Sequence, residues 1–566
     1  MKLYIQRITT LAAASSFLWT TSCRTSDTEN TLATGGPVTI SAMLDGVEFG
    51  GQTGKPQAST GKISLAENNR QSHTTMLDPS SFITVEAITD NTSPKASAKL
   101  NTMAAIAPVI PDTDINKLAL PIGTRVRIAA YLGTSTTTDR TKDYIVRANG
   151  VLEPENGALT LTHNQPYTLV VYSNGTPTLP AHSSSINYTY DNNYTDLQKD
   201  FMYRKYINYV PNGGLGTNNI VIRLQHKTTQ IVTNFNFADN ITNIIDPRIG
   251  TNYLDGSINL NNNSISTEGY VANGNTTGTV PLTVTISTDR HSATAPPVKI
   301  NGASGAAGAT TTGSFIAQIN TTDAINGTSL SRNVNAPFLI KPGYKTTLNI
   351  VQGRCGANIN GVNRFFMCHN LGADYTVNPD PTDPTTDKAK LHGAKYMWGA
   401  LTPTLSMEED QSAQNVSFTP NGANNNQWGT SGASNNPCPQ GYRMPTKNEM
   451  ESLFGYNGTD NQYNSSTFTG TPWLIGINNY GNFRTVTSKS NPAYSMSLPA
   501  AGFRSTSSMG SSITYRGYMG WYWASYAGSV LNYYLQFQGS NDGTTLTGVY
   551  TTGGANLLSI RCIADQ

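Results

Sequence analysis

The chain has 566 residues and a net charge of +2, and only 13% of its residues are charged. This charge balance gives no reason to expect nucleic acid or an acidic membrane as a partner. Charged residues are about half as frequent as in an average globular protein, so Asn, Thr, Ser and Gly carry most of the surface. At roughly 150 residues per domain, the length predicts three or four domains.

The N-terminal residues predict an export signal. A basic start is followed by an apolar stretch, residues 8–19, and by small residues that lead to Cys23. This order is typical of bacterial lipoproteins. We therefore expect a leader over 1–22, acylation of Cys23 (palmitate included) and an anchor and flexible segment over 23–36. An ordinary signal peptide is the alternative, because Thr20 stands where lipoprotein signals usually carry Leu. The general secretory route and the outer membrane follow from the lipoprotein interpretation.

The first two thirds of the chain alternate apolar and polar residues in short runs broken by Gly, Pro and Asn. Such runs predict strands of antiparallel sheets with one solvated face, and close spacing of the strands favours sandwiches. The runs lie at 159–163, 167–171, 220–226, 231–237 and 280–286. One short helix is expected over 195–206, where Leu197 and Phe201 are four residues apart.

Two changes along the sequence suggest domain boundaries. The glycine-rich segment 213–216 is typical of a junction, and aromatic and Cys residues become frequent after 352–354. Of the six Trp, five lie between Trp398 and Trp523. We therefore expect domains at 37–215, 216–352 and 353–566.

After Cys23, the remaining cysteines all lie in the last third of the chain: Cys355, Cys368, Cys438 and Cys562. Their even number allows two disulfides, and the spacing lacks Cys-x-x-Cys or a neighbouring His pair that would indicate a metal site. Structural disulfides are the expectation, with buried free thiols as the alternative.

The first two expected domains resemble the fimbrillin superfamily of Bacteroidia fimbriae. The residues that carry the resemblance are 120–128, 165–172, 224–227 and the ending 338–348, which includes Pro342-Gly343-Tyr344. The resemblance implies two transthyretin-like β-sandwich domains, assembly by donor-strand exchange, and maturation by cleavage after an Arg. Arg70, in a polar stretch between expected strands, is the candidate for that cleavage.

The third expected domain resembles the Fibrobacter major paralogous domain family. Four elements occur in the family's order: 435–450, which contains Cys438-Pro439 and Arg443-Met444-Pro445-Thr446, then Leu498–Arg504, Trp523–Ser525 and Ser559–Cys562. The resemblance implies an α+β fold similar to C-type lectins and formylglycine-generating enzymes. The whole chain is thus expected to be mostly β, with two sandwiches followed by a C-type-lectin-like domain.

The first of these elements also predicts a helix on its own residues. Pro445 suits a first helical turn, Thr446 and Glu449 have capping-box spacing, and Met450 begins an apolar face. These residues are interpreted as structural. A bridge from Cys438, just before this helix, to Cys562 would close a long loop and contribute roughly 4–5 kcal/mol; Cys355–Cys368 is then the remaining pair.

Enzyme motifs are not found: the sequence lacks a His-Glu-x-x-His, a nucleophile elbow, a Walker loop and a dinucleotide fingerprint. Formylglycine-generating enzymes need a pair of cysteines near the C-terminus, where this chain has only Cys562. We therefore expect no enzyme and no cofactor. A weak calcium candidate is the loop with Asp380, Asp383 and Asp387, because Ca²⁺ takes several oxygen ligands; a plain exposed turn is the alternative.

One aromatic-rich segment is a candidate ligand surface. Tyr515, Tyr518, Trp521, Tyr522 and Tyr526 are too many for one core face. Aromatic rings with a polar tip are common at binding surfaces, although about half of them are expected to fill the core.

The leading hypothesis is an accessory subunit at the tip of a fimbria, with shaft and accessory subunits as partners. It would adhere to a host or bacterial receptor, either glycan or protein. The expected location is the cell surface, first at the outer membrane through the lipid and then in the fimbrium. A stand-alone glycan-binding lipoprotein is the alternative.

Overall fold

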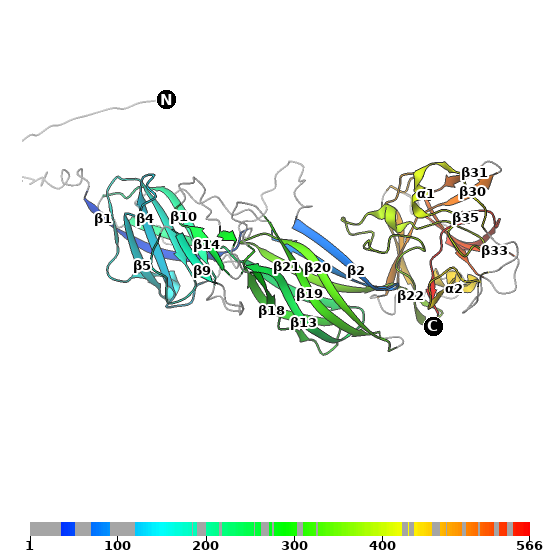
Figure 1. Ribbon diagram of the computed structural model, residues 1–566, viewed down its shortest axis with the longest axis horizontal. Coiled ribbons are helices and arrows are strands. Elements are labelled where there is room, and N and C mark those ends of the chain that lie inside the picture. Colours follow the sequence, from blue (N-terminus) through cyan, green and yellow to red (C-terminus); the bar gives the residue numbers. More distant parts are fainter. Residues whose placement is uncertain are drawn as a thin grey trace, which may run out of the picture.

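The computed structural model describes residues 36–565, except for 51–68, 91–118, 184, 190–199, 214–217, 254, 262–270, 274–276, 303–309, 324–326, 422–427, 429–434, 455–463, 471, 489–493, 508–509, 526–530 and 540–546. The described chain is mostly β, as the sequence predicts, and contains several β-sheet domains. Figure 1 shows three bodies in a row, which we call the first domain, the second domain and the C-terminal domain.

The first domain is one eight-stranded sheet that curls around its core. Met43 of the first strand forms a bridge with Val151, directly before the strand Leu152–Pro154, so the two ends of the sheet meet. In spatial order the strands are β6 (Leu152–Pro154), β5 (Arg140–Val146), β4 (Arg125–Leu132), β8 (Tyr167–Ser173), β10 (Met202–Tyr209), β11 (Asn218–His226), β1 (Pro37–Glu48) and β7 (Leu159–Thr162).

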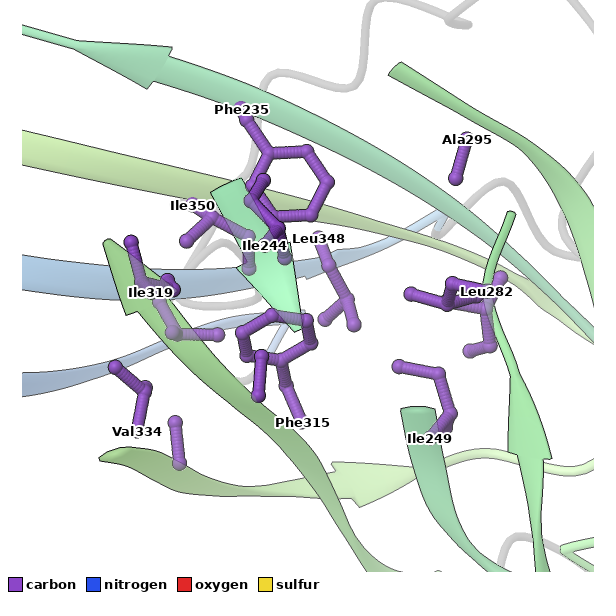
Figure 2. Packing of buried hydrophobic residues seen from close by; sticks show 14 of the residues in the cluster. Phe235, Ile244, Ile249, Leu282, Ala295, Phe315, Ile319, Val334, Leu348 and Ile350 are labelled. Carbon is purple, nitrogen blue, oxygen red and sulfur yellow. The ribbon is translucent and has the colours of Figure 1, made fainter. Parts of the chain in front are cut away.

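The second domain is a sandwich of two sheets. One contains β17 (Thr285–Ile286), β18 (Ser292–Ile300), β12 (Thr229–Phe237), β21 (Lys345–Arg354), β3 (Ser81–Thr89) and β2 (Arg70–Asp78). The other contains β16 (Thr277–Pro281), β13 (Asn240–Tyr253), β19 (Thr311–Thr322) and β20 (Ser329–Ile340). Figure 2 shows how Phe235 and Ile350 of the first sheet pack against Phe315 and Ile319 of the second. The alternation predicted over 231–237 places every second residue in this core.

The predicted boundary between the first two domains is wrong. Strands β2 and β3 belong to the second domain, because β3 pairs with β21 and Glu86 lies opposite Asn349. Strand β11 belongs to the first domain, where it pairs with β10 and β1. Residues 214–216 of the expected junction 213–216 lie outside the described residues, and the strands before and after it, β10 and β11, are neighbours in one sheet. The chain leaves the first domain after β1, forms the β2–β3 hairpin in the second, and returns.

The outer face of the first domain's sheet is covered by a segment from the second domain. A small sheet joins β9 (Ser185–Thr189), β14 (Asp255–Asn259) and β15 (Val271–Asn273). Ile258 and Leu260 pack against Val170 and Tyr172 of β8, whose residues are all buried. The expectation of one solvated face fails for this strand, because a remote segment covers it.

The helix expected over 195–206 is contradicted where the structure describes it, since Met202–Tyr209 form strand β10. Strand pairing with β8 places Met202 opposite Ser173 and Tyr206 opposite Leu169. Long-range sheet pairing has thus overridden the local i, i+4 pattern.

The C-terminal domain combines small sheets with two short helices, α1 (Met407–Ser412) and α2 (Lys447–Leu453). Thr446 and Glu449 form the predicted capping box at α2, and Met450 and Leu453 are buried; Pro445, however, precedes the N-cap instead of lying in the first turn. The strands are β22 (Gly356–Ile359), β23 (Val362–Phe365), β24 (Tyr396–Met397), β25 (Asn415–Val416), β26 (Tyr442–Arg443), β27 (Asn464–Thr469), β28 (Phe483–Ser488), β29 (Ser495–Pro499), β30 (Phe503–Ser507), β31 (Gly510–Thr514), β32 (Met519–Ala524), β33 (Asn532–Gln538), β34 (Thr547–Thr552), β35 (Leu557–Leu558) and β36 (Ile563–Ala564).

Candidate functional site: the first strand and the C-terminal aromatic surface

Strand β1 closes the first domain and is the first candidate site. It lies between β11 and β7, parallel to the former and antiparallel to the latter. The other strand pairs of this sheet are antiparallel. A parallel strand that closes an otherwise antiparallel sheet has no hairpin connection to its parallel neighbour, so it can leave without breaking a turn.

The side chains of β1 fill a strand-shaped part of the core. Ile40 and Val47 are completely buried and Leu44 is 3% exposed. Each such side chain stabilises the fold by about 1.5–3 kcal/mol relative to exposure. A bulge between Leu44 and Gly46 shifts the register so that Val47 also faces inward. The apolar side chains of β1 are therefore an integral part of the core of the first domain.

Arg70 lies at the start of β2, the edge strand of the second domain, rather than between strands. Its side chain is 49% exposed and forms an ion pair with Glu86 of β3. Among the described residues, β1 is the only sheet strand N-terminal to this position. A cut after Arg70 would thus detach β1 from the chain and leave the hairpin partner β3 in place.

The turn of the β2–β3 hairpin contacts the C-terminal domain. The backbone N–H of Cys355 donates to the carbonyl of Ser80 at 2.8 Å, and that of Cys368 donates to Pro79 at 2.8 Å. The buried guanidinium of Arg354 lies 3.0 Å from Asp78 and 2.9 Å from Asp239. The hairpin is therefore held by both the second and the C-terminal domain; in Figure 1, β2 extends from one toward the other.

The four cysteines form the two expected pairs, Cys355–Cys368 and Cys438–Cys562. The first closes 13 residues at the entry to the C-terminal domain, and the second closes 124 residues. Cys562 precedes β36, which pairs with β26. The second bridge thus ties the last described strand to the entry of α2.

The predicted ligand surface is only partly available. Tyr522 is completely buried, so it belongs to the core. Trp521 is stacked between Phe503, at 3.9 Å, and Tyr534, at 4.3 Å, so neighbouring rings cover both of its faces. A sugar cannot stack on it there.

What remains of this surface is narrower than the prediction. Tyr515 and Tyr518 are half-buried, and Tyr550, which the prediction omitted, lies beside Tyr534 and is 39% exposed. Tyr550 was missed because it lies on β34, outside the aromatic-rich segment. Tyr526 lies outside the described residues, as do Cys23 and the leader.

The carboxylates of the three calcium candidates accept hydrogen bonds within their own turns. The carboxylate of Asp380 accepts hydrogen bonds from the N–H and hydroxyl of Thr382, and Asp383 does the same with Thr385. Asp387 accepts from the backbone of Ala389 and caps a short 3₁₀ turn. Within the described part of the chain, no group of three or more His, Cys, Asp or Glu side chains that could hold a metal ion is found.

Arg504 and Arg561, which lie in the elements Leu498–Arg504 and Ser559–Cys562, bind buried ionic and polar groups. Arg504 pairs with Asp410 at 2.6 Å, and Arg516 contacts the other oxygen of that carboxylate. Arg561 donates to Asn370 and to the carbonyls of Met367 and Cys368. The arginines are fully enclosed, so these residues support the fold.

Acid should destabilise the C-terminal domain through His369. Burial lowers the pKa of His369 to about 4, whereas an unfolded His titrates near 6.5. Below that value the unfolded chain binds more protons, so stability falls as the pH drops from about 6.5 to about 4, by about 3 kcal/mol for this group. Urea unfolding at pH 7.5 and pH 4.5 measures the loss. His369→Gln should reduce the pH dependence of the free energy of unfolding of the C-terminal domain, and His163→Gln in the first domain should not. Equal pH dependence in the two variants would refute the assignment.

No protein-family profile matches the chain, and no curated protein matches it at a significant level. Solved structures with similar parts include a candidate cell adhesion protein of Bacteroides fragilis (11% identity, 58% of this chain and 95% of that chain, TM-score 0.28) and another of Bacteroides uniformis (16%, 40% and 91%, TM-score 0.26). The tip fimbrial protein Mfa3 of Porphyromonas gingivalis, truncated at its C-terminus, is 12% identical over 38% of this chain and 75% of that chain, with a TM-score of 0.22. Likeness at this level does not place the chain in a family. Within the described residues, no helix is long and apolar enough to cross a bilayer.

Proposed function

We propose that this protein is a structural and adhesive accessory subunit at the tip of a bacterial fimbria. It reaches the outer membrane as a lipoprotein acylated at Cys23. A strand of a neighbouring subunit then replaces β1, and the C-terminal domain adheres to a receptor on a host or bacterial surface. The observation that carries the proposal is the place of β1. It fills part of the core, and a single cut after Arg70 would break its covalent link to the rest of the chain.

The C-terminal domain supports the tip position. Ile563–Ala564 pairs with Tyr442–Arg443, and the preceding Cys562 is bridged to Cys438. This strand is held in its own domain and is not free to enter the groove of another subunit. The chain is thereby suited to accept a strand rather than to donate this one.

Arg70→Ala should block maturation without unfolding the protein. Its ion pair with Glu86 is half-exposed, and such pairs contribute at most about 1 kcal/mol. N-terminal sequencing of the assembled subunit should show Gln71 in the wild type. Arg140→Ala, at another partly exposed arginine, is the control and should assemble normally. A mature chain that begins at Cys23 would rule out this cleavage.

Removal of the C-terminal domain should leave incorporation intact and abolish adhesion. The truncation must keep Arg354, because this residue belongs to β21 and pairs with Asp239; we therefore place the stop after 354 and not at 352. Immunogold labelling of sheared filaments and a cell-adhesion assay separate the two effects. Adhesion equal to that of the full chain would contradict the assignment. Absence of both proteins from filaments would favour the stand-alone glycan-binding lipoprotein.

A further inference from the structure

The end of β1 reaches beyond the first domain. Phe49 follows the strand directly, is 2% exposed, and stacks on the ring of His226 at 3.8 Å with an interplanar angle of 14°. The N–H of the next residue, Gly50, donates to the carbonyl of Gly343 at 2.7 Å. Gly343 precedes β21 of the second domain, so the residues that end β1 bind both domains at once.

Phe49 covers one face of His226, which belongs to a buried ionic cluster. Asp200 and His226 come from the first domain, and Lys299 comes from β18 of the second. Lys299 Nζ lies 2.6 Å from Asp200 Oδ2, and His226 Nδ1 contacts the same oxygen. Thr228 donates its hydroxyl to the other oxygen of Asp200. All four residues are nearly inaccessible to water, and an ionic cluster of this kind is stable only while its groups stay paired and enclosed.

One ring nitrogen of this cluster is kept from water without a hydrogen-bond partner in the described chain. His226 Nε2 is buried and has no hydrogen-bond partner among the described residues. Burial lowers the pKa of His226, which favours the neutral ring. The charged groups that face it are Asp200 and Lys299. If the Phe49 ring left, the face of His226 that it covers would be open to water.

We infer that position 49 locks the first domain to the second, and that a strand replacing β1 must supply an aromatic ring there. The inference rests on the proposed strand exchange for its second half only. The fitting partner is a strand of another subunit with apolar residues aligned with Ile40, Leu44 and Val47, then an aromatic residue. Glycine should follow, because a Cβ at Gly50 would lie 2.8 Å from the Tyr344 ring.

The lock is tested first in the full chain, without any exchange. Phe49→Ala should speed hydrogen exchange at least tenfold at two amides of the junction, Lys227, which donates to Phe201, and Gln230, which donates to Tyr344. Ser41→Ala, at an exposed position of the same strand, should change neither. Phe49→Leu keeps apolar volume without a flat ring, so its exchange rates at these amides should lie between those of Phe49→Ala and Ser41→Ala. This intermediate result would separate loss of the ring contact from simple unfolding. Junction exchange in Phe49→Ala equal to that in Ser41→Ala would overturn the inference.

The requirement for an aromatic residue at position 49 of the incoming strand is tested with protein cleaved after Arg70 and synthetic peptides of residues 37–50. The native peptide should bind and restore protection of the junction amides. A peptide with Leu44→Ala should bind more weakly. One with Phe49→Ala should bind at least tenfold more weakly and restore no protection at the junction. Failure of the native peptide would count against strand exchange itself. Binding and protection by the Phe49→Ala peptide equal to the native one would count against the aromatic requirement alone.

Discussion

Asp410→Asn is expected to lower the free energy of unfolding of the C-terminal domain by about 3–5 kcal/mol, the usual loss when one partner of a buried ion pair is removed. Asp410 is completely buried, with Arg504 at one carboxylate oxygen and Arg516 at the other. Lys395 is buried nearby, and burial lowers its pKa to about 8. The amide would leave two enclosed guanidinium groups without a counter-charge.

Chemical denaturation followed by Trp fluorescence measures this loss, because the Trp residues described by the structure lie in this domain. Glu408→Gln is the matched control: it removes a carboxylate from the same helix, α1, at an exposed position. The control should change stability by less than about 0.5 kcal/mol. Equal effects of the two variants would show that the buried pair contributes little.

Replacing both Cys438 and Cys562 by Ser should destabilise the C-terminal domain by about 5 kcal/mol, and the same change at Cys355 and Cys368 by about 3 kcal/mol. The difference arises because Cys438–Cys562 closes 124 residues and Cys355–Cys368 only 13. A longer loop restricts the unfolded chain more strongly, so its loss costs more.

The two double variants control for each other, since each removes one buried bridge from the same domain. Unfolding by guanidinium at pH 7 gives both free energies. A larger loss for the 13-residue loop would mean that contacts at the hairpin turn, where Cys355 and Cys368 bind Ser80 and Pro79, outweigh the chain-entropy effect.

Local patterns predicted local structure well. The alternation over 220–226 and 231–237 became β11 and β12, and the Thr446/Glu449 spacing became the capping box of α2. These signals depend on neighbours within a few residues, so no knowledge of the rest of the chain is needed to read them.

Long-range placement was not readable from the sequence. Nothing in residues 70–89 indicates that their partners lie more than 250 residues later, as the contact of Glu86 with Asn349 requires. The burial of both faces of β8 depends on a segment around Ile258. In the aromatic segment, the composition indicates which residues are aromatic. It does not indicate that Trp521 is enclosed by Phe503 and Tyr534. Phe49 was also missed; its only signal is a lone aromatic residue that ends an apolar run.

The path of the β2–β3 hairpin has a consequence for how the chain folds. Residues 70–89 leave the ribosome and the export channel early, but β3 can enter its sheet only when β21 arrives, about 260 residues later. Closing so long a loop is slow, and an unpaired hairpin edge is prone to wrong contacts meanwhile. The first two domains should therefore mature together, late and almost in one step. Pulsed hydrogen exchange during refolding would show Ser81–Thr89 gaining protection no earlier than Lys345–Arg354.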